Sequence, residues 1–406
     1  MKLSPPQALI SRSTARFKTA VCGRRFGKSF LSINEMAKFA RVPHRKIVYV
    51  APTHAQAKQI IFDELVDRLR TVRWVERVNI SEMNIYLKNK SVIMIRSGDK
   101  PDRLRGLAID FLVLDEFADI NPDIWESVRP ALSDRKGHCL FIGTPKGFNW
   151  ARDLFENGLN DDMPDWEAFS FTTLDGGRVA EEEITSARRD LDERSFRQEY
   201  MATWEQYSGN IYFSFDRDMH TKSTEQPTDK DVIHIGIDFN VSPMSAICFV
   251  ARKDGLHAFD EIVIYGSNTY EMCDEIKQRF PKNRITVYPD ASGGNQNTKG
   301  ISDHKILQNS GFDLKAPRAN PPVKDRISAV NAALKSADGS IRLRINKKCR
   351  KLIEALTKQT YKDDTRQPDK SLGVDHFNDA AGYCVHYLMP VKRDIVPSKT
   401  KYWGTY

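Results

Sequence analysis

The sequence has no apolar run that approaches the ~20 residues a membrane-spanning helix needs. Its opening stretch, MKLSPPQALISRSTARF, lacks the apolar core of a secretory signal peptide, so we expect a cytoplasmic location and no membrane partner. Its six cysteines are scattered without a single Cys-x-x-Cys pair. Secreted, membrane-spanning, disulfide-stabilised and zinc-stabilised proteins are therefore poor interpretations of this chain.

What is present is an ordinary globular composition of 406 residues, 40% hydrophobic and 29% charged. The length predicts two or three domains, each large enough to bury its own core. The formal net charge is +8 at pH 7. Such an excess is typical of proteins that bind a polyanion such as nucleic acid, although many soluble proteins are mildly basic.

Short apolar runs alternate with helical patterns through the first half of the chain. The runs are FKTAVC (17–22), KIVYV (46–50), FLVL (111–114) and CLFI (139–142). Near-continuous apolar strands separated by helices are typical of a parallel sheet that is covered on both faces. We therefore predict an α/β fold with a mainly parallel sheet for this half.

The stretch AVCGRRFGKSF (20–30) follows the first of these strands and precedes a helical pattern. It ends in Gly27, Lys28 and Ser29, which complete a phosphate-binding loop, but Cys22 stands where the first glycine usually lies and Gly23 follows one residue late. Between a strand and a helix, the backbone N–H groups and the helix N-terminus can surround a phosphate. Lys28 would reach the β- and γ-phosphates of a nucleotide, and the Ser29 hydroxyl would hold Mg²⁺.

Four arginines lie where positive charge can act on a nucleotide. Arg24 and Arg25 fill the loop, and the segment PDRLRG (101–106) adds Arg103 and Arg105 just before a later strand. Guanidinium groups stabilise the charge that develops on a transferred phosphoryl group, and a neighbouring subunit can supply one. The alternative is that each is a surface arginine with a solvated head.

Two further strand ends carry polar residues that hydrolysis needs. FLVLDEFAD places Asp115 and Glu116 after a buried strand. There the aspartate can hold the water shell of a metal, and the glutamate can orient or deprotonate an attacking water. CLFIGTPKG places Thr144 where it can sense the γ-phosphate, unless the segment is a plain strand-to-turn exit. The loop and the acidic pair together predict nucleoside triphosphate hydrolysis.

Polar, turn-rich segments mark a change of organisation after about residue 205. We predict an ATPase domain over residues 1–210, a linker over 211–230 and a second domain over 231–406. The second domain opens with three strands in meander order, and a later strand, ITVYPDASGG, ends in Asp290. Asp238 lies inside the apolar strand GIDFN, and Asp379 lies on the late helix DHFNDAAGY.

These three aspartates come in the order of a ribonuclease-H-like nuclease on a mixed sheet. Carboxylates brought together in this way can hold two Mg²⁺ or Mn²⁺ ions about 4 Å apart at a phosphodiester. Asp238 is the most informative, because an aspartate inside an apolar strand is costly to bury without a partner such as a metal. Taken singly, each is more often a surface or capping residue. Asp375 is either the N-cap of the last helix or a fourth ligand, on the same helix face as Asp379.

Basic side chains gather near these acids in the sequence. Residues 341–351, IRLRINKKCRK, contain six Lys or Arg, and residues 361–373, YKDDTRQPDKSLG, predict a loop or hairpin beside the acidic residues. Both can follow a DNA backbone through charge. A solvated basic helix face is the alternative for any one of these residues.

Together these motifs resemble the large terminase subunit of tailed bacteriophages, a DNA-packaging motor and nuclease. The resemblance covers nearly the whole chain and rests on CGRRFGKS, VAPT, FLVLDE, GTP, FRQEY (196–200), GIDFN, YPDAS and DHFNDA, in the order of the family. The missing first glycine of the loop and the loop arginine are themselves typical of that family. The resemblance implies a P-loop ATPase domain of RecA/ASCE type, followed by a ribonuclease-H-like nuclease domain.

The resemblance also implies roles for single residues. Gln7 becomes an adenine contact, Arg24 the loop arginine, Glu116 the water-activating residue and Thr144 the coupling residue. Arg105 becomes a finger that acts on a neighbouring subunit, and the nuclease triad is made of Asp238, Asp290 and Asp379. The predicted nucleotide-binding set is Gln7, Gly23, Arg25, Gly27, Lys28, Ser29, Asp115 and Thr144. The predicted metal ligands are Ser29 and Asp115 at the nucleotide, and Asp238, Asp290, Asp375 and Asp379 at the nuclease site.

The biology of the family follows as implication. ATP hydrolysis with Mg²⁺ drives double-stranded DNA into a procapsid through the portal protein, and the nuclease, with Mg²⁺ or Mn²⁺, cuts concatemeric DNA. A small terminase subunit selects the viral DNA. The motor is typically a ring on the procapsid, often a pentamer, while the isolated large subunit is often a monomer. We expect the protein in the cytoplasm of an infected bacterium and not in the mature virion.

Two other functions stay open at this point. A cellular helicase-nuclease for DNA repair would need a second RecA-like domain, and no such motifs follow Thr144. A nucleotide-switched DNA-binding or assembly protein without catalysis would tolerate the loss of Glu116 and of Asp238. An ATP-driven motor with a metal-dependent endonuclease would tolerate neither loss.

Overall fold

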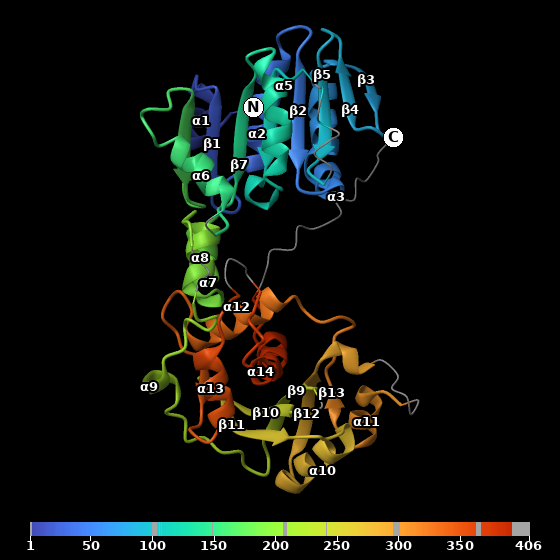
Figure 1. The fold of residues 1–406 in the computed structure, drawn as a ribbon, viewed down its shortest axis with the longest axis vertical. Coiled ribbons are helices and arrows are strands. Elements are labelled where there is room, and N and C mark those ends of the chain that lie inside the picture. Colours follow the sequence, from blue (N-terminus) through green and yellow to red (C-terminus); the bar gives the residue numbers. More distant parts are fainter. Residues whose placement is uncertain are drawn as a thin grey trace. The chain divides into compact units, whose positions relative to one another are not determined.

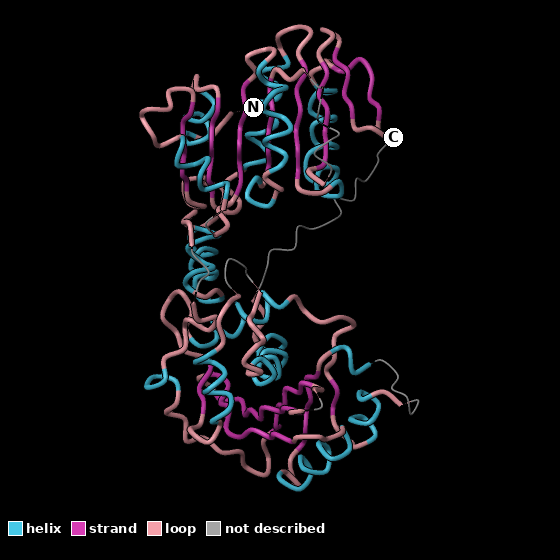
Figure 2. Tube along the Cα trace, in the orientation of Figure 1, coloured by secondary structure: helices cyan, strands magenta, loops and turns pink. Residues whose placement is uncertain are grey.

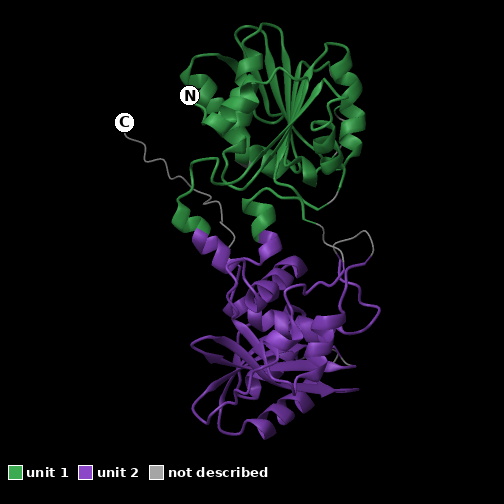
Figure 3. Ribbon diagram, turned by 90° about the vertical axis from the view of Figure 1, so that its left-hand side faces the viewer, with its two compact units in different colours: residues 1–184, 196–206 green, residues 185–195, 207–406 purple. Residues whose placement is uncertain are grey.

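The structure is a computed structural model, and it describes residues 2–99, 104, 106, 108–147, 149–205, 209–240, 242–294, 301–362 and 367–391. The chain divides into two compact units, residues 1–184 with 196–206 and residues 185–195 with 207–406 (Figure 3). The stretch from residue 209 to residue 230, which includes the predicted linker, groups with the second unit. The division into 1–210, 211–230 and 231–406 stays a prediction about functional domains.

The first unit is built on an eight-stranded sheet in the order β3-β4-β5-β2-β6-β7-β1-β8 (Figure 1). The six strands from β5 to β8 in this order are parallel to one another, whereas β4 runs antiparallel to β3 and β5. The sheet is therefore mainly parallel, as predicted. Its strands are β1 (Phe17–Cys22), β2 (Lys46–Ala51), β3 (Val75–Asn79), β4 (Asn84–Leu87), β5 (Val92–Ser97), β6 (Phe111–Asp115), β7 (His138–Gly143) and β8 (Trp166–Phe171).

Both faces of this sheet are buried. Along β2, Ile47 and Tyr49 pack into one apolar cluster while Val48 and Val50 pack into another, as the two-residue period of a strand requires. Two-sided burial explains why the strands are continuous apolar runs in the sequence. The helices of this unit are α1 (Pro5–Arg12), α2 (Lys28–Ala40), α3 (His54–Ala57), α4 (Asp63–Thr71), α5 (Asp123–Ser133) and α6 (Trp150–Asn157), and α7 (Glu181–Asp190) and α8 (Glu193–Tyr200) follow at its boundary.

The second unit is built on a six-stranded mixed sheet in the order β13-β12-β9-β10-β11-β14. β9, β10 and β11 form the predicted antiparallel meander, and β12 runs parallel to β9. The edge strands β13 and β14 are parallel to β12 and β11. The strands are β9 (Val232–Asp238), β10 (Met244–Arg252), β11 (Gly255–Ile264), β12 (Arg284–Pro289), β13 (Asp313–Leu314) and β14 (Leu343–Ile345).

Helices cover both faces of the second sheet (Figure 2). α12, α13 and α14 bury one face, and α10 and α11 bury the other. At Gly236 of β9 a Cβ would lie 1.9 Å from the carbonyl oxygen of Ala380, so glycine is needed for α14 to pack directly on the strand. The helices are α9 (Arg217–His220), α10 (Thr269–Arg279), α11 (Asp303–Asn309), α12 (Val323–Leu334), α13 (Arg350–Lys358) and α14 (Asp375–Leu388). Among all the helices described, none is long and apolar enough to cross a bilayer.

Three local predictions can be compared with the structure. Within the basic stretch 341–351, residues 343–345 form β14, and Arg350 and Lys351 are exposed on the first turn of α13, so a basic helix face describes only these last two. Asp375 is the first residue of α14 and Val374 is its N-cap, so the capping alternative for Asp375 is also wrong. Residues 361–373 are predicted to form a loop or hairpin, and the antiparallel bridge between Tyr361 and Pro368 agrees with the hairpin.

Candidate functional site

The phosphate loop joins the end of β1 to the start of α2. Gly27, at the N-cap of α2, has φ +96°, a left-handed conformation in which glycine is favoured. Its carbonyl accepts the Leu31 N–H at 3.0 Å and starts the helix. Lys28 and Ser29 are the first two residues of α2, whose N–H groups need partners from outside the helix. The loop is thus built as predicted for a phosphate group.

The position of Gly23 is explained by its neighbours. A Cβ at Gly23 would lie 2.6 Å from the Thr173 nitrogen and 2.6 Å from the Tyr200 carbonyl oxygen. The backbone after β8 and the end of α8 therefore press directly on the loop. A side chain at this position would push them away, which gives a physical reason for a glycine one residue later than the usual pattern.

Lys28, Glu116 and Thr144 form one cluster, although they come from α2 and from the ends of β6 and β7. The Lys28 ammonium lies 2.6 Å from Thr144 Oγ1 and 3.1 Å from Glu116 Oε1. The Thr144 N–H donates to Glu116 Oε2 at 3.1 Å. Burial alone would raise the pKa of Glu116, but Lys28 and the Thr144 N–H outweigh it, and the pKa lies below its usual value. Glu116 is therefore ionised at neutral pH, as a residue that orients water must be.

Asp115 is held behind Glu116. The Tyr49 hydroxyl donates to Asp115 Oδ2, and the Glu116 N–H donates to Asp115 Oδ1 at 3.0 Å. Burial and the neighbouring Glu116 charge raise the pKa of Asp115 to about 6. Tyr49 lies inside β2, and the sequence analysis did not single it out. Tyr49 could have been noticed because it is an aromatic residue with a hydroxyl group within an otherwise aliphatic run.

The loop arginines differ in their surroundings. The Arg24 side chain forms an ion pair with Glu199 of α8 at 2.5 Å, and the Arg24 N–H donates to the Glu199 carbonyl at 2.7 Å. Burial opposes the charge, but Glu199 outweighs it and raises the pKa of Arg24. Arg25 is exposed with φ +61°. Arg105 and Arg103 lie outside the described residues.

Gln7 of α1 is completely buried against the phosphate loop. Its Nε2 donates to the carbonyls of Phe26 and Gly27 at 3.3 and 3.2 Å, and its Oε1 accepts the Ser4 N–H at 3.0 Å. The side chain therefore fixes the loop backbone to α1. An adenine contact from Gln7 stays a prediction.

The second unit brings Asp238, Asp290 and Asp379 together. Asp238 ends β9, and Asp290 follows β12, which pairs in parallel with β9; the Asp290 N–H donates to the Ile237 carbonyl at 3.2 Å. Asp379 lies on α14, which packs on β9 at Gly236. Burial first, and then the charges of Asp379 and Asp290, raise the pKa of Asp238 to about 6, although a hydrogen bond from His376 opposes the shift. Asp238 is therefore close enough to Asp379 and Asp290 for their charges to disfavour its ionisation.

Each of these carboxylates has polar partners that the sequence analysis did not single out. His376 Nδ1 lies 2.8 Å from Asp238 Oδ2. Asp290 accepts hydrogen bonds from the Asn320 amide at 2.7 Å and the Tyr383 hydroxyl at 3.1 Å. The buried Arg326 donates to Asp379 at 2.6 Å, and its guanidinium stacks over the Tyr383 ring at 4.5 Å. His376 and Tyr383 could have been found from the spacing of α14, but Arg326 and Asn320 required the fold.

Asp375 lies one turn before Asp379 and is almost fully buried. Its carboxylate pairs with the Lys370 ammonium at 3.0 Å. The pKa of Lys370 is raised, chiefly by its hydrogen bond to Asp375. The negative charges of Asp379 and Asp238 raise it further. The segment predicted to be a hairpin thus places a lysine beside the acidic residues.

The acidic set has the chemistry of a site for a hard divalent cation. Within the part of the chain that the structure describes, no three His, Cys, Asp or Glu side chains stand close enough to hold one metal ion as they are. The side chains that converge here are nevertheless carboxylates, which Mg²⁺ and Mn²⁺ prefer. The raised pKa of Asp238 reflects first its burial and then the nearby charges of Asp379 and Asp290, and a bound cation would offset both. The chemistry of these residues therefore fits such an ion.

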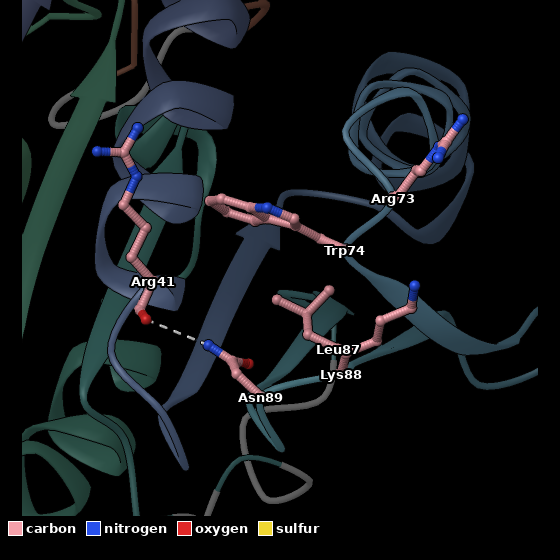
Figure 4. Close-up of a pocket in the computed structure, with 6 residues that line it drawn as sticks. All are labelled: Arg41, Arg73, Trp74, Leu87, Lys88 and Asn89. Atoms are coloured by element: carbon pink, nitrogen blue, oxygen red, sulfur yellow. Dashed lines mark hydrogen bonds between the residues drawn. The ribbon is translucent and has the colours of Figure 1, made fainter.

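A separate cavity of about 280 Å³ lies in the first unit, lined by Arg41, Arg73, Trp74, Leu87, Lys88 and Asn89 (Figure 4). The Asn89 amide donates to the Arg41 carbonyl at 3.2 Å, which fixes the end of α2 against the turn after β4. None of the predicted nucleotide-site residues lines this cavity.

Comparison with known proteins decides the family. Residues 20–219 match the family model "Terminase large subunit, T4likevirus-type, N-terminal", and residues 235–388 match "Terminase RNaseH-like domain". The chain belongs to the large terminase subunit family. The resemblance inferred from the motifs is thereby confirmed, and the chain carries the ATPase domain and the RNase H-like nuclease domain of a large terminase.

Relatives of this large terminase chain come from several phages. It is 26% identical over 402 residues to the large terminase subunit of Escherichia phage T5, covering 92% of this chain and 87% of that protein. It is 32% identical over 244 residues to that of Thermus phage G20c, covering 52% and 50%. Its fold is similar to the solved large terminase of a thermophilic bacteriophage, with a TM-score of 0.64 at 15% identity over 96% of this chain and 100% of that one. A structure of the same phage protein in complex with ADP gives a TM-score of 0.63 at 16% identity, over 96% and 100%.

Proposed function

We propose that this large terminase subunit couples ATP hydrolysis in its first unit to the translocation of double-stranded DNA, and cuts concatemeric DNA in its second unit. The observation that carries the proposal is the pairing of two separate clusters in one chain. Lys28, Glu116 and Thr144 meet at the phosphate loop, and carboxylates from β9, β12 and α14 meet on the mixed sheet. The first set suits phosphoryl transfer, and the second suits phosphodiester cleavage.

At the nucleotide, each residue has a role that its position supports. Lys28 binds the β- and γ-phosphates, and Gly23, Arg25 and Gly27 shape the loop around them. Glu116, kept ionised by Lys28, orients the attacking water. Thr144 contacts both Lys28 and Glu116, so loss of the γ-phosphate changes its partners. Ser29 and Asp115 would hold Mg²⁺, which neutralises phosphate charge when bound.

Three further roles belong to the same proposal. Gln7 contacts adenine while it holds the loop, and Arg24 stabilises the charge that develops on the transferred phosphoryl group. Arg105 acts on the ATP of a neighbouring subunit.

At the nuclease site, Asp238, Asp290 and Asp379 would hold the divalent ions, with Asp375 as a fourth acidic residue. The ions, Mg²⁺ or Mn²⁺, supply Lewis acidity and lower the pKa of a bound water when present. The chain's own residues orient the ligands. His376 holds Asp238, Asn320 and Tyr383 hold Asp290, and Arg326 holds Asp379.

The assembly that this function requires is also proposed. The chain acts as a ring, a pentamer in the usual family pattern, on the portal of a procapsid, and is a monomer when isolated. A small terminase subunit supplies the DNA selection. Packaging takes place in the cytoplasm of the infected bacterium, and the chain does not stay in the mature virion.

Paired variants of the full chain test the two activities. Glu116→Gln should lower ATP turnover at least about a hundredfold, because the water loses its orienting carboxylate, and should leave plasmid cleavage with Mn²⁺ intact. Asp238→Asn should do the reverse. Glu156→Gln, which alters an exposed i,i+4 ion pair, is the control for both assays. If both site variants kept both activities, the non-catalytic nucleotide switch would be the better account.

A further inference from the structure

The turn that follows β8 packs over the phosphate loop. The Thr173 hydroxyl donates to the Arg24 carbonyl at 2.8 Å, and a Cβ on Gly176 would lie 2.8 Å from Phe26 Cα. Gly177, with φ +64°, then turns the chain back toward the loop. This turn places Arg178 beside the phosphate loop. None of the motifs found in the sequence includes Arg178.

Arg178 has a defined place beside the loop. Its Cζ lies 4.6 Å from the centroid of the Phe30 ring, and the same atom is 3.3 Å from the point where a Cβ on Gly27 would stand. Gln7 Nε2 is 2.7 Å from that point. Arg178 is exposed, and no carboxylate of the described residues pairs with it. The Arg178 guanidinium stacks on Phe30 and is not neutralised by an ion pair with any residue that the structure describes. Its positive charge and the other face of its plane are therefore available to a ligand.

The position of Arg178 indicates which part of a nucleotide it would contact. Lys28, Glu116 and Thr144 mark the γ-phosphate end of the proposed site. Arg178 instead stands beside Gln7 and over Phe30, which comes one residue after Ser29 in the first turn of α2. The guanidinium is planar and has one face against Phe30, so a second planar group can stack on the other face.

We propose that Arg178 binds the base of ATP by stacking its guanidinium on the purine ring. This inference deepens the proposed nucleotide site and rests on it. Because a base stack is present in ATP and ADP alike and is remote from the reacting phosphate, it contributes to binding and not to the chemical step.

The test measures affinity and turnover separately in the full chain. Arg178→Ala should weaken the Kd for ATP and for ADP about tenfold and raise the KM for ATP similarly, with kcat within about twofold of wild type. The Kd for inorganic tripolyphosphate, which has no base, should not change. Arg178→Lys should lose as much as Arg178→Ala, because an ammonium cannot stack. Phe30→Leu should weaken ATP binding in the same direction.

Arg77→Ala is the matched control, because Arg77 is an exposed arginine stacked on Tyr86 at 4.2 Å in the same unit. The Arg77→Ala variant should leave the Kd values, the KM for ATP and kcat unchanged. Equal loss of tripolyphosphate affinity, lower kcat at constant KM, or unchanged ATP affinity in Arg178→Ala would each overturn the inference. A wild-type chain that bound no ATP would instead overturn the nucleotide site itself, so the two failures are distinguishable.

Discussion

Single residues at the nuclease site are placed where their charge is costly. Asp238 is 8% exposed and ends β9 on the face where Gly236 packs against α14, whereas the isoleucines of the strand fill the apolar cluster on the other face. Its carboxylate is close to Asp290 and Asp379, and its pKa is raised to about 6. A fold selected for stability alone would not place three acids here, so the arrangement is that of a site and not of a core.

The raised pKa predicts a stability change for Asp238→Asn. Because the folded-state pKa exceeds the unfolded value of 3.8, the ionised carboxylate costs stability fully above pH 6, and the cost disappears as the pH falls toward 4. The asparagine variant should therefore be more stable by up to about 3 kcal/mol at pH 7.5 with chelator, a gain of several degrees in Tm. Thermal unfolding at pH 7.5 and pH 4.5 measures this gain, which should shrink at the lower pH.

A matched variant has the opposite expected sign. Hydrogen bonds from Arg252 lower the pKa of the half-buried Asp231 to about 2, so its stabilising contribution is present above pH 3.8 and lost as the pH falls through 2. Asp231→Asn should slightly lower the Tm at pH 7.5. A lower Tm for Asp238→Asn, or a gain that did not depend on pH, would contradict the buried-charge explanation.

At the scale of elements, the sequence predicts what local patterns determine. Continuous apolar runs located β1, β2, β6 and β7. The polar residues at the ends of the last two runs are Asp115, Glu116 and Thr144. The antiparallel β3 and β4 were not predicted, because β3 is a largely exposed edge strand without an apolar run and β4 has only four residues, of which the first is Asn84. Arg326, Asn320 and Arg178 reach the sites only through tertiary packing, so no local pattern could assign them.

The packing of α14 on β9 gives an element-scale prediction. Gly236→Ala would place a Cβ 1.9 Å from the Ala380 carbonyl oxygen and force α14, with Asp375 and Asp379, away from Asp238. We expect loss of plasmid cleavage and destabilisation by several kcal/mol, on the order of other overpacked cores. Thermal unfolding, plasmid cleavage and ATP turnover of the full chain measure this, and turnover should be retained.

A second glycine serves as the control for this prediction. At Gly382, also on α14, a Cβ would lie 3.5 Å from Arg326 Cβ, an ordinary contact, and alanine favours a helix. Gly382→Ala should be neutral or slightly stabilising. If Gly236→Ala cut DNA normally, the direct contact of α14 with β9 would not be what assembles the acids.

For the whole molecule, the net charge of +8 favours a polyanionic partner, but only some cations are free to bind one. Within 341–351, Arg344 pairs with Asp254, and Arg342 donates to backbone carbonyls. Lys347 and Lys348 are exposed and have no ion-pair partner among the described residues. If this stretch follows a DNA backbone, these two lysines and the exposed Arg350 are the side chains that displace counterions.

Salt dependence tests this role of the charge. Each phosphate contact contributes about 0.9 to the slope of log K against log salt, so Lys347→Ser with Lys348→Ser should make the slope shallower by about 2 and weaken duplex binding at low salt. Binding of a duplex of about 30 base pairs measured between about 50 and 200 mM KCl gives the slope. Lys282→Ser removes an exposed lysine of the same unit that is already paired with Asp229, and it should change the slope little. The slope is proportional to the number of phosphates that the protein contacts. An unchanged slope in the double variant would therefore mean that Lys347 and Lys348 contact no phosphate and that DNA binds another surface.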